Sequence, residues 1–361
     1  MTVPQPADDT PVPRDPSSSG SGSSGSGSGS SGSPTMRDVA NAAGVSPMTV
    51  SRALRDDPRV SAEKKTRIMT AVSALGYRRN EAARNLRTGR SRGLIGLVVA
   101  NLANPFYSQL ALGVEATASE HGMQVILGNS GEDVDRERQL VGDFASRRLD
   151  GIVVMPVGSN HRHLSAAQQE GIPVVLAASP PVKFAADAVM LDDFGGTWEA
   201  IRHLIEAGHR KIAFLGLPAS TWTGSERFRG YCTALEEAGL PLDERIVSLQ
   251  HRDVAAAERA TLALLDQDDP PTAVFAANNR NTIGAYRAIR GRRPGVALAG
   301  FDDFELADML GLPLMVVTYD PAELGRQAAE LLCDHIGNAP QQAGLAARRI
   351  VIPTKLVEYG L

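Results

Sequence analysis

From residue 93 onward the chain alternates between short apolar runs and longer amphipathic stretches, and this rhythm limits the possible folds more than any other feature. Most of the apolar runs are separated by stretches of about 10–17 residues that have the periodicity of an amphipathic helix. Such alternation predicts parallel strands covered on both faces by crossover helices. The runs lie at 94–100, 123–128, 151–155, 173–178, 211–216, 273–276, 296–300, 314–318 and 349–352. They are too many for one ordinary sheet. The sequence therefore predicts an α/β body over residues 93–361 with two doubly wound, Rossmann-like lobes.

Polar and aromatic side chains follow several of these runs. Ligands of doubly wound folds bind at the carboxyl ends of strands, and a cleft between two lobes is the natural place here. The candidate ligand-binding residues are Phe106, Tyr107, Arg227, Asn278 and Asp302. A structural interpretation competes: Asp302 and Asn278 would only cap helices, and Arg227 would pair with Glu226 or another neighbouring acid.

Residues 35–79 have a different pattern, that of three short helices. Thr35 and Asp38 have the spacing of a capping box, and Gly44 ends the first helix. Ser46 and Pro47 begin the second helix, since a cap hydroxyl precedes a ring that is preset for the first helical position. The third helix is expected to start at Ser61, to face inward through Ile68, Val72 and Leu75, and to end at Gly76.

Two helices joined by a glycine-containing turn predict a helix-turn-helix. If Val50, Ala53 and Leu54 are buried, the opposite face of the second helix is free to enter a major groove. That face carries Pro47, Met48, Thr49, Ser51 and Arg52. An arginine can bind guanine through two hydrogen bonds, hydroxyls can bind phosphates or base edges, and a methionine can contact a thymine methyl.

The charge distribution supports a nucleic-acid partner for this segment. Residues 35–92 contain 13 lysines and arginines against five acidic residues, a net charge of +8, whereas the whole chain has a net charge of −4. A basic head on an acidic body indicates that a polyanion binds the head. A basic surface with no partner is the alternative.

The remaining features exclude several classes. Residues 1–34, rich in Pro, Ser and Gly, predict a disordered tail. No apolar run is long enough to span a membrane, and we expect no secretion signal. The only cysteines, Cys232 and Cys333, have no metal-ligand spacing, so we expect neither a metal nor a cofactor. The low cysteine content fits a reducing compartment, so we expect a cytoplasmic location. Because phosphate-loop and nucleophile-elbow motifs are missing, an enzyme is not expected. A solute-binding transport protein shares the two lobes but would lack the basic head.

The head resembles the lactose-repressor (LacI/GalR) family of transcriptional regulators. The resemblance lies in D-V-A-x-x-A-G-V-S-x-x-T-V-S-R-x-L at 38–54, followed by V-S at 60–61, G-Y at 76–77 and N-x-A-A-R-x-L at 80–86. The motifs I-G-L-V-V at 95–99 and N-P-F-Y at 104–107 continue it into the body. The resemblance implies a body like type I periplasmic binding proteins, a palindromic double-stranded DNA operator, a homodimer and a small, sugar-like effector that acts allosterically.

The resemblance also assigns roles to matching residues. Pro47, Met48 and Arg52 match base-reading positions, and the residues that match backbone-contacting positions are Thr35, Ser46, Thr49, Ser51, Ser61, Tyr77 and Asn80. Residues 80–92 form the expected hinge, in which Ala83 and Leu86 enter the minor groove, and Arg84 and Arg55 complete the candidate DNA-binding set. Four residues depart from the family pattern: Arg55 replaces Asn, Arg79 replaces Pro, Asn279 replaces Asp, and Ala178 replaces an Asp common in sugar-responsive members.

Overall fold

The computed structural model describes residues 34–77, 93–249, 251, 253–292, 295–337 and 346–360. Within it the chain divides into two compact units, 1–81 and 82–361. The predicted tail up to residue 33 lies outside the described residues, as does the predicted hinge at 80–92 with Asn80, Ala83, Arg84 and Leu86. We call the first unit the head and the second the body.

The head contains three helices, α1 (Met36–Ala43), α2 (Pro47–Ala53) and α3 (Ala62–Leu75). Their core includes Val39, Val50, Ala53 and Ile68, all buried. Leu75 does not belong to it: its side chain is 37% exposed, so the inward position expected for it was wrong. Leu75 is the last residue of α3, directly before the Gly76 cap, and lies beyond the core that the three helices share.

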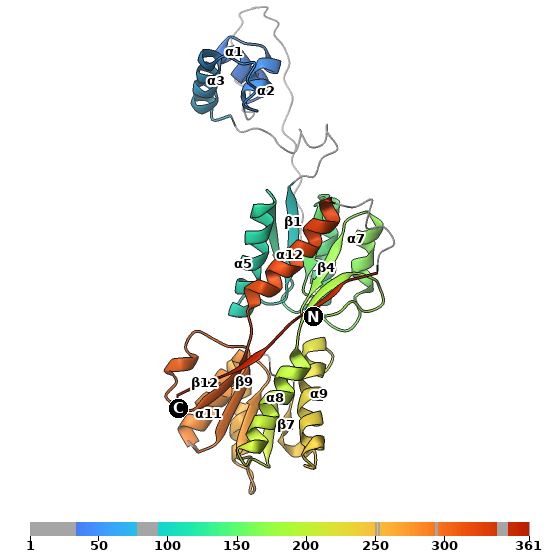
Figure 1. Cartoon of the computed structure of the whole chain (residues 1–361), viewed down its shortest axis with the longest axis vertical. Helices are drawn as coiled ribbons and strands as arrows, with labels where there is room; N and C mark the ends of the chain where they lie inside the picture. The colour runs from blue at the N-terminus through green and yellow to red at the C-terminus, as the bar shows by residue number, and fades with distance from the viewer. Residues whose placement is uncertain are drawn as a thin grey trace, which may run out of the picture. The chain divides into compact units, whose positions relative to one another are not determined.

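The body consists of two α/β lobes (Figure 1), and the predicted fold class is confirmed. The first lobe has an all-parallel sheet with the strand order β11-β5-β4-β3-β1-β2. Its strands are β1 (Leu94–Val99), β2 (Gln124–Asn129), β3 (Gly151–Val154), β4 (Val174–Ala177), β5 (Asp187–Leu191) and β11 (Arg349–Ile352). Helices α5 (Pro105–Glu120) and α12 (Pro321–Gly337) pack on one face, and α6 (Val134–Ser146) and α7 (Ser165–Gln169) on the other.

The second lobe has a sheet of the order β12-β10-β9-β8-β6-β7. Its strands are β6 (Ile212–Leu215), β7 (Val247–Ser248), β8 (Ala273–Ala276), β9 (Ala297–Phe301), β10 (Leu314–Thr318) and β12 (Lys355–Tyr359). Helices α8 (Asp193–Glu206) and α9 (Trp222–Glu237) cover one face, and α10 (Val254–Leu265) and α11 (Asn279–Arg292) cover the other. Only β12 runs antiparallel to its neighbour.

Three strands were missed by the sequence prediction: β5, β7 and β12. In particular, β12 (Lys355–Tyr359) pairs with β10 at the edge of the second sheet. Its pattern of exposed and half-buried side chains has no apolar run that would reveal it.

The chain passes between the lobes three times, after β5, after β10 and after β11, since these strands and the elements that follow them belong to different lobes. Parallel strands align their carboxyl ends, so the loops of both lobes meet near these crossings. No described helix is long and apolar enough to cross a membrane.

Candidate functional site

Local side-chain bonds fix the two helices of the helix-turn-helix. Thr35 and Asp38 form the expected capping box, with the Thr35 backbone N–H donating to Asp38 Oδ2 at 2.8 Å. These bonds lower the pKa of Asp38. Ser46 Oγ accepts the Thr49 N–H at 3.2 Å and caps α2. Arg67 Nη2 on α3 donates to the Ala43 carbonyl at 2.6 Å, so a third-helix side chain caps the end of α1. These bonds cap the starts of α1 and α2 and join α3 to the end of α1.

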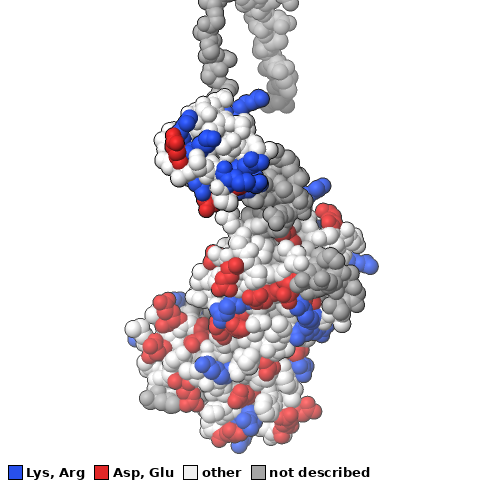
Figure 2. All heavy atoms as spheres, turned by 45° about the horizontal axis from the view of Figure 1, so that its top comes forward, with Lys and Arg blue, Asp and Glu red and all other residues white. Residues whose placement is uncertain are grey.

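One face of α2 points away from the head's core. Met48 is 60% exposed and Arg52 is exposed, while Val50 and Ala53 on the other face are buried. The Arg52 guanidinium makes no hydrogen bond to any described residue. Figure 2 shows Lys and Arg side chains with a few acidic ones on the displayed face of the head, and mixed acidic and basic ones over the body. The outward face of α2 has the side-chain types and the exposure that base reading requires.

The other predicted DNA-binding residues of the head differ in how far their side chains are already bonded or packed within the head. Thr49 bonds Ser46, and Arg55 Nε, just beyond the end of α2, donates back to the Ser51 carbonyl at 3.2 Å, so the Arg55 side chain lies against the last turn of α2. Ser61 precedes α3 and is exposed, without a side-chain capping bond. Tyr77 is half-buried against the head's core. DNA contact by all of these residues stays a prediction.

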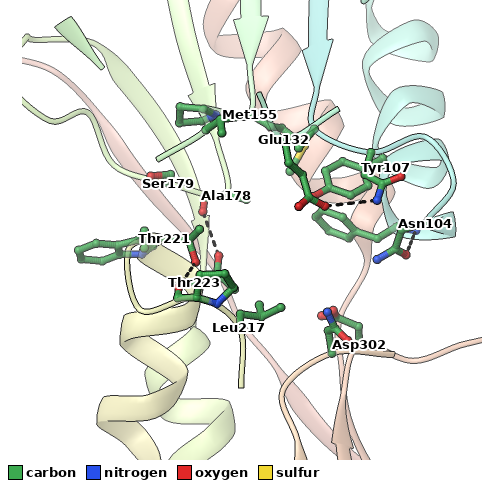
Figure 3. A pocket seen from close by; sticks show the side chains of 18 of the residues that line it. Asn104, Tyr107, Glu132, Met155, Ala178, Ser179, Leu217, Thr221, Thr223 and Asp302 are labelled. Carbon is green, nitrogen blue, oxygen red and sulfur yellow. Dashed lines mark hydrogen bonds between the residues drawn. The ribbon is translucent and has the colours of Figure 1, made fainter. Parts of the chain in front are cut away.

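A cavity of about 370 Å³ lies between the lobes of the body. Its walls come from the carboxyl ends of strands of both lobes (Figure 3). All five predicted effector-binding residues line it: Phe106, Tyr107, Arg227, Asn278 and Asp302. The structure thus brings together side chains that lie up to nearly 200 positions apart in the sequence.

Arg227 is the buried centre of a charged network beside this cavity. Its guanidinium bonds Asp193 through Nε at 2.8 Å, the Ala277 carbonyl through Nη1 at 2.6 Å and Asp302 through Nη2 at 3.2 Å. It also lies over the Phe301 ring, 3.5 Å from the centroid. The neighbouring acid that Arg227 pairs with is Asp193, rather than Glu226, which bonds Arg229.

Two carboxylates, Asp193 and Asp302, share this one cation, and the pKa of Asp193 reflects its surroundings. Burial raises the pKa of Asp193 to about 6, although Arg227 acts in the opposite direction. The second oxygen of Asp193, Oδ2, is buried and has no hydrogen-bond partner among the described residues. Burial lowers the pKa of Arg227, but Asp302 and Asp193 outweigh this and raise it above the ordinary value. The Arg227 guanidinium therefore stays charged, and Asp193 holds a proton more readily than an exposed aspartate does.

Asp302 and Asn278 combine structural bonds with atoms left for a ligand. Asp302 Oδ1 accepts the Tyr319 hydroxyl at 2.8 Å, while its Oδ2 has no partner among the described residues. Asn278 Oδ1 accepts the Asn281 N–H at 2.8 Å, so Asn278 does cap α11, as the structural interpretation expected. Its amide nitrogen makes no such bond. Each residue thus anchors itself with one atom and offers another to the cavity.

The aromatic wall comes from both lobes. Phe106 meets Tyr107 edge-to-face with centroids 5.1 Å apart, and Tyr319 at 6.0 Å. Burial and the Glu132 charge raise the pKa of Tyr107, so its hydroxyl is neutral. Trp222, at the start of α9, also lines the cavity and is 37% exposed. Such rings can cover an apolar ligand face.

Sequence reasoning missed several lining residues. They are polar side chains, chiefly Asn104, Glu132, Ser179, Thr221, Thr223, His251 and Arg280, and only Asn104 belongs to a motif noted in the sequence. Asn104 had the clearest signal, because an Asn before Pro105 is a typical helix cap. Within the described ranges, no group of three or more His, Cys, Asp or Glu residues could hold a metal ion.

Comparison with known proteins matches both units. Residues 35–80 match the family described as bacterial regulatory proteins, lacI family, and residues 92–359 match periplasmic binding proteins and sugar binding domain of LacI family. The HTH-type transcriptional regulator DegA of Bacillus subtilis is 32% identical over 90% of this chain and 96% of its own. The ribose operon repressor of Haemophilus influenzae is 32% identical over 84% and 92%. The solved structure of the transcriptional regulator CelR with cellobiose is 30% identical, covers 91% of this chain and 100% of that one, and has a TM-score of 0.67.

Proposed function

We propose a function from the premise that this chain belongs to the LacI family of bacterial regulatory proteins. It is a DNA-binding transcriptional regulator, and we assign it to the repressors. Its head binds operator DNA, and a small effector in the cavity between the lobes controls that binding. A regulator of genes acts where the DNA is, so the proposal places it in the bacterial cytoplasm. The relatives named above are regulators, which favours this function over an enzyme.

Helix α2 carries the DNA-binding part of this proposal. Its cap residues and buried face hold it rigidly against the head, while Met48 and Arg52 project from the opposite face. A seven-residue helix reads only a few base pairs. Two heads related by two-fold symmetry are needed for a longer site, so the proposal includes a homodimer on a palindromic operator.

The effector proposal rests on the chemistry of the cavity. A free carboxylate oxygen at Asp302, a free amide nitrogen at Asn278 and the Phe106 ring suit a polyhydroxylated ring, which offers hydroxyls at its edge and C–H groups on its face. Arg280 lines the same cavity, and its guanidinium bonds no described residue. The effector class therefore extends to sugars that carry a carboxylate or phosphate.

Control of DNA binding follows from two lobes joined by three crossings. A ligand that prefers one lobe arrangement shifts the population toward it, and such couplings typically change affinity by about 5–150-fold. Because the crossing segments after β5 and β10 contain the network residues Asp193 and Tyr319, cavity and crossings are in direct contact.

A binding assay with the chain's own promoter region tests the DNA-binding part. Fluorescence anisotropy is measured for that fragment and for a shuffled duplex of the same composition, over a range of salt concentrations. We expect the promoter to bind at least about 10³-fold more tightly than the shuffled duplex at physiological salt. Equal, salt-sensitive binding to both duplexes would refute the proposed function.

A ligand screen tests the effector part. Both tryptophans, Trp198 and Trp222, belong to the second lobe, and Trp222 lines the cavity, so intrinsic fluorescence reports binding there. Neutral sugars, uronic acids and sugar phosphates form three arms of the screen, each repeated on Arg280→Gln. If acidic sugars bind the wild type better and lose that advantage in Arg280→Gln, the extension to anionic effectors holds. If Arg280→Gln prefers acidic sugars as strongly as the wild type does, the extension to anionic effectors is refuted.

A further inference from the structure

One buried hydrogen bond crosses directly from lobe to lobe beside the cavity. Asn279 Nδ2, at the start of α11 in the second lobe, donates to Asn104 Oδ1, at the start of α5 in the first lobe, at 2.9 Å. The two residues are 3% and 8% exposed, so water does not compete with this bond. A second cross-lobe bond, from Thr223 Oγ1 to the Ala178 carbonyl, is longer at 3.4 Å. Figure 3 shows Asn104 on the opposite side of the pocket from Thr223 and Ala178.

The orientation of Asn104 is fixed by its own helix. Its Oδ1 also accepts the Phe106 N–H at 3.1 Å, which caps α5 and makes the atom facing the second lobe an acceptor. Only a donor at position 279 can pair with it. An asparagine supplies that donor and an ionised aspartate does not, so the Asn found here in place of the usual Asp permits the bond.

The bond is kept although it leaves a buried atom without a partner. Asn279 Oδ1 is buried and makes no hydrogen bond to any described residue. A side chain chosen only for stability would avoid this cost. Asn104 in turn lines the cavity, so a ligand that fills the cavity touches one half of the bridge.

We propose that Asn104 and Asn279 form an interlobe latch, a pair of positioning residues that sets the resting equilibrium between lobe arrangements on which the effector acts. The existence of the latch rests on the fold alone, whereas its regulatory consequence rests on the proposed function. Loss of one neutral hydrogen bond shifts such an equilibrium by about 2- to 13-fold.

Hydrogen exchange followed by mass spectrometry on the full chain tests the latch without any ligand. Asn279→Ala lies in the second lobe, yet it should accelerate exchange about 2- to 13-fold in the first-lobe peptide that contains the Phe106 amide. Asn279→Asp, of nearly the same size, should accelerate it at least as much because two acceptors would then face each other.

Asn281 provides a matched control on the same helix. It is also an asparagine, is 0% exposed, and has an unpartnered Oδ1, but its amide nitrogen bonds Leu215 within the second lobe at 3.3 Å. Asn281→Ala should change exchange in the second lobe only. If Asn279→Ala behaves like Asn281→Ala, or if Asn279→Asp leaves the first lobe as slow as in the wild type, the latch is refuted.

Promoter binding by the same variants separates the latch from the proposed function. Asn279→Ala should shift the anisotropy-derived affinity for the promoter fragment, with Asn281→Ala nearer the wild type. If the wild type does not distinguish the promoter from the shuffled duplex while exchange shows the cross-lobe effect, the latch stands and the proposed function fails.

Discussion

Removal of the Arg227 guanidinium should unfold the second lobe more easily, and the structure gives the size of the effect. Arg227→Met keeps much of the side-chain volume and the contact with Phe301 but leaves Asp193 and Asp302 without their shared cation. The side chains of Arg227 and Asp193 are 2% and 1% exposed, so solvent screens the loss very little. Breaking a buried pair in this way costs about 3–5 kcal/mol.

The cost should depend on pH with a definite sign. Without the cation, burial and repulsion from Asp302 raise the folded-state pKa of Asp193 further, and a raised carboxyl pKa stabilises the fold at low pH and loses that contribution as the pH rises. In the wild type, Asp193 already has a pKa of about 6 for the same reason, but Arg227 limits the effect. The difference in stability between Arg227→Met and the wild type should therefore shrink on going from about pH 8 to about pH 5.

Urea unfolding followed by tryptophan fluorescence measures this, because Trp198 and Trp222 both report on the second lobe. The double variant Arg227→Met, Asp193→Asn is the control, and it should recover a large part of the loss at the higher pH. A cost below about 1 kcal/mol, or a cost that is the same at both pH values, would show that the network is not a coupled buried charge system.

Three further predictions concern the head, the packing and the cavity. Arg52→Ala should cost about 1–3 kcal/mol of binding at one operator base pair and relax specificity there; an equal loss for every single-base operator variant would contradict base reading. Gly113→Ala should cost about 1–3 kcal/mol or more, because a Cβ there would overlap the Ala322 carbonyl where α5 packs on α12, whereas Gly142→Ala, an exposed helical site with open space around it, should gain about 0.5–1 kcal/mol. Equal urea midpoints for these two glycine variants would refute the packing argument. Asp302→Asn should weaken binding of a screened sugar by about 1.5–3 kcal/mol, as fluorescence titration would measure, and an unchanged affinity would remove Asp302 from the binding residues.

Much of the body's fold follows from apolar runs, and the exceptions have physical reasons. Among the predicted strands, β3, β4, β6, β8 and β10 are buried throughout and read as continuous apolar sequence, whereas β2 and β11 are partly exposed edge strands that their apolar runs still revealed. β12 is an edge strand with partly exposed side chains, β7 has only two residues, and β5 begins with Asp187, which is buried because Arg348 and His335 bond it. Such strands depend on contacts with distant residues that no local pattern reveals.

The site was more predictable in position than in chemistry. Parallel strands place their carboxyl ends together, so residues that follow strands had to meet, and Phe106, Asn278 and Asp302 do. Which atoms remain free was not predictable. The Asn278 side-chain oxygen caps α11, and three nitrogens of Arg227 contact protein acceptors, one of which is Asp193, 34 residues earlier.

Arg227 and Asp302 hold the lobe crossings as well as the cavity wall, and this double attachment is what a sensor needs. Asp193 is the first residue of α8 directly after the crossing from β5, and Tyr319 directly follows β10 at the next crossing. The first bonds Arg227 and the second bonds Asp302, each at 2.8 Å. A ligand oxygen that engages the free Oδ2 of Asp302 therefore acts on a group already bonded to two crossings. Because close-packed interiors change between discrete arrangements rather than deforming continuously, a small rearrangement there can favour one relative position of the lobes over another.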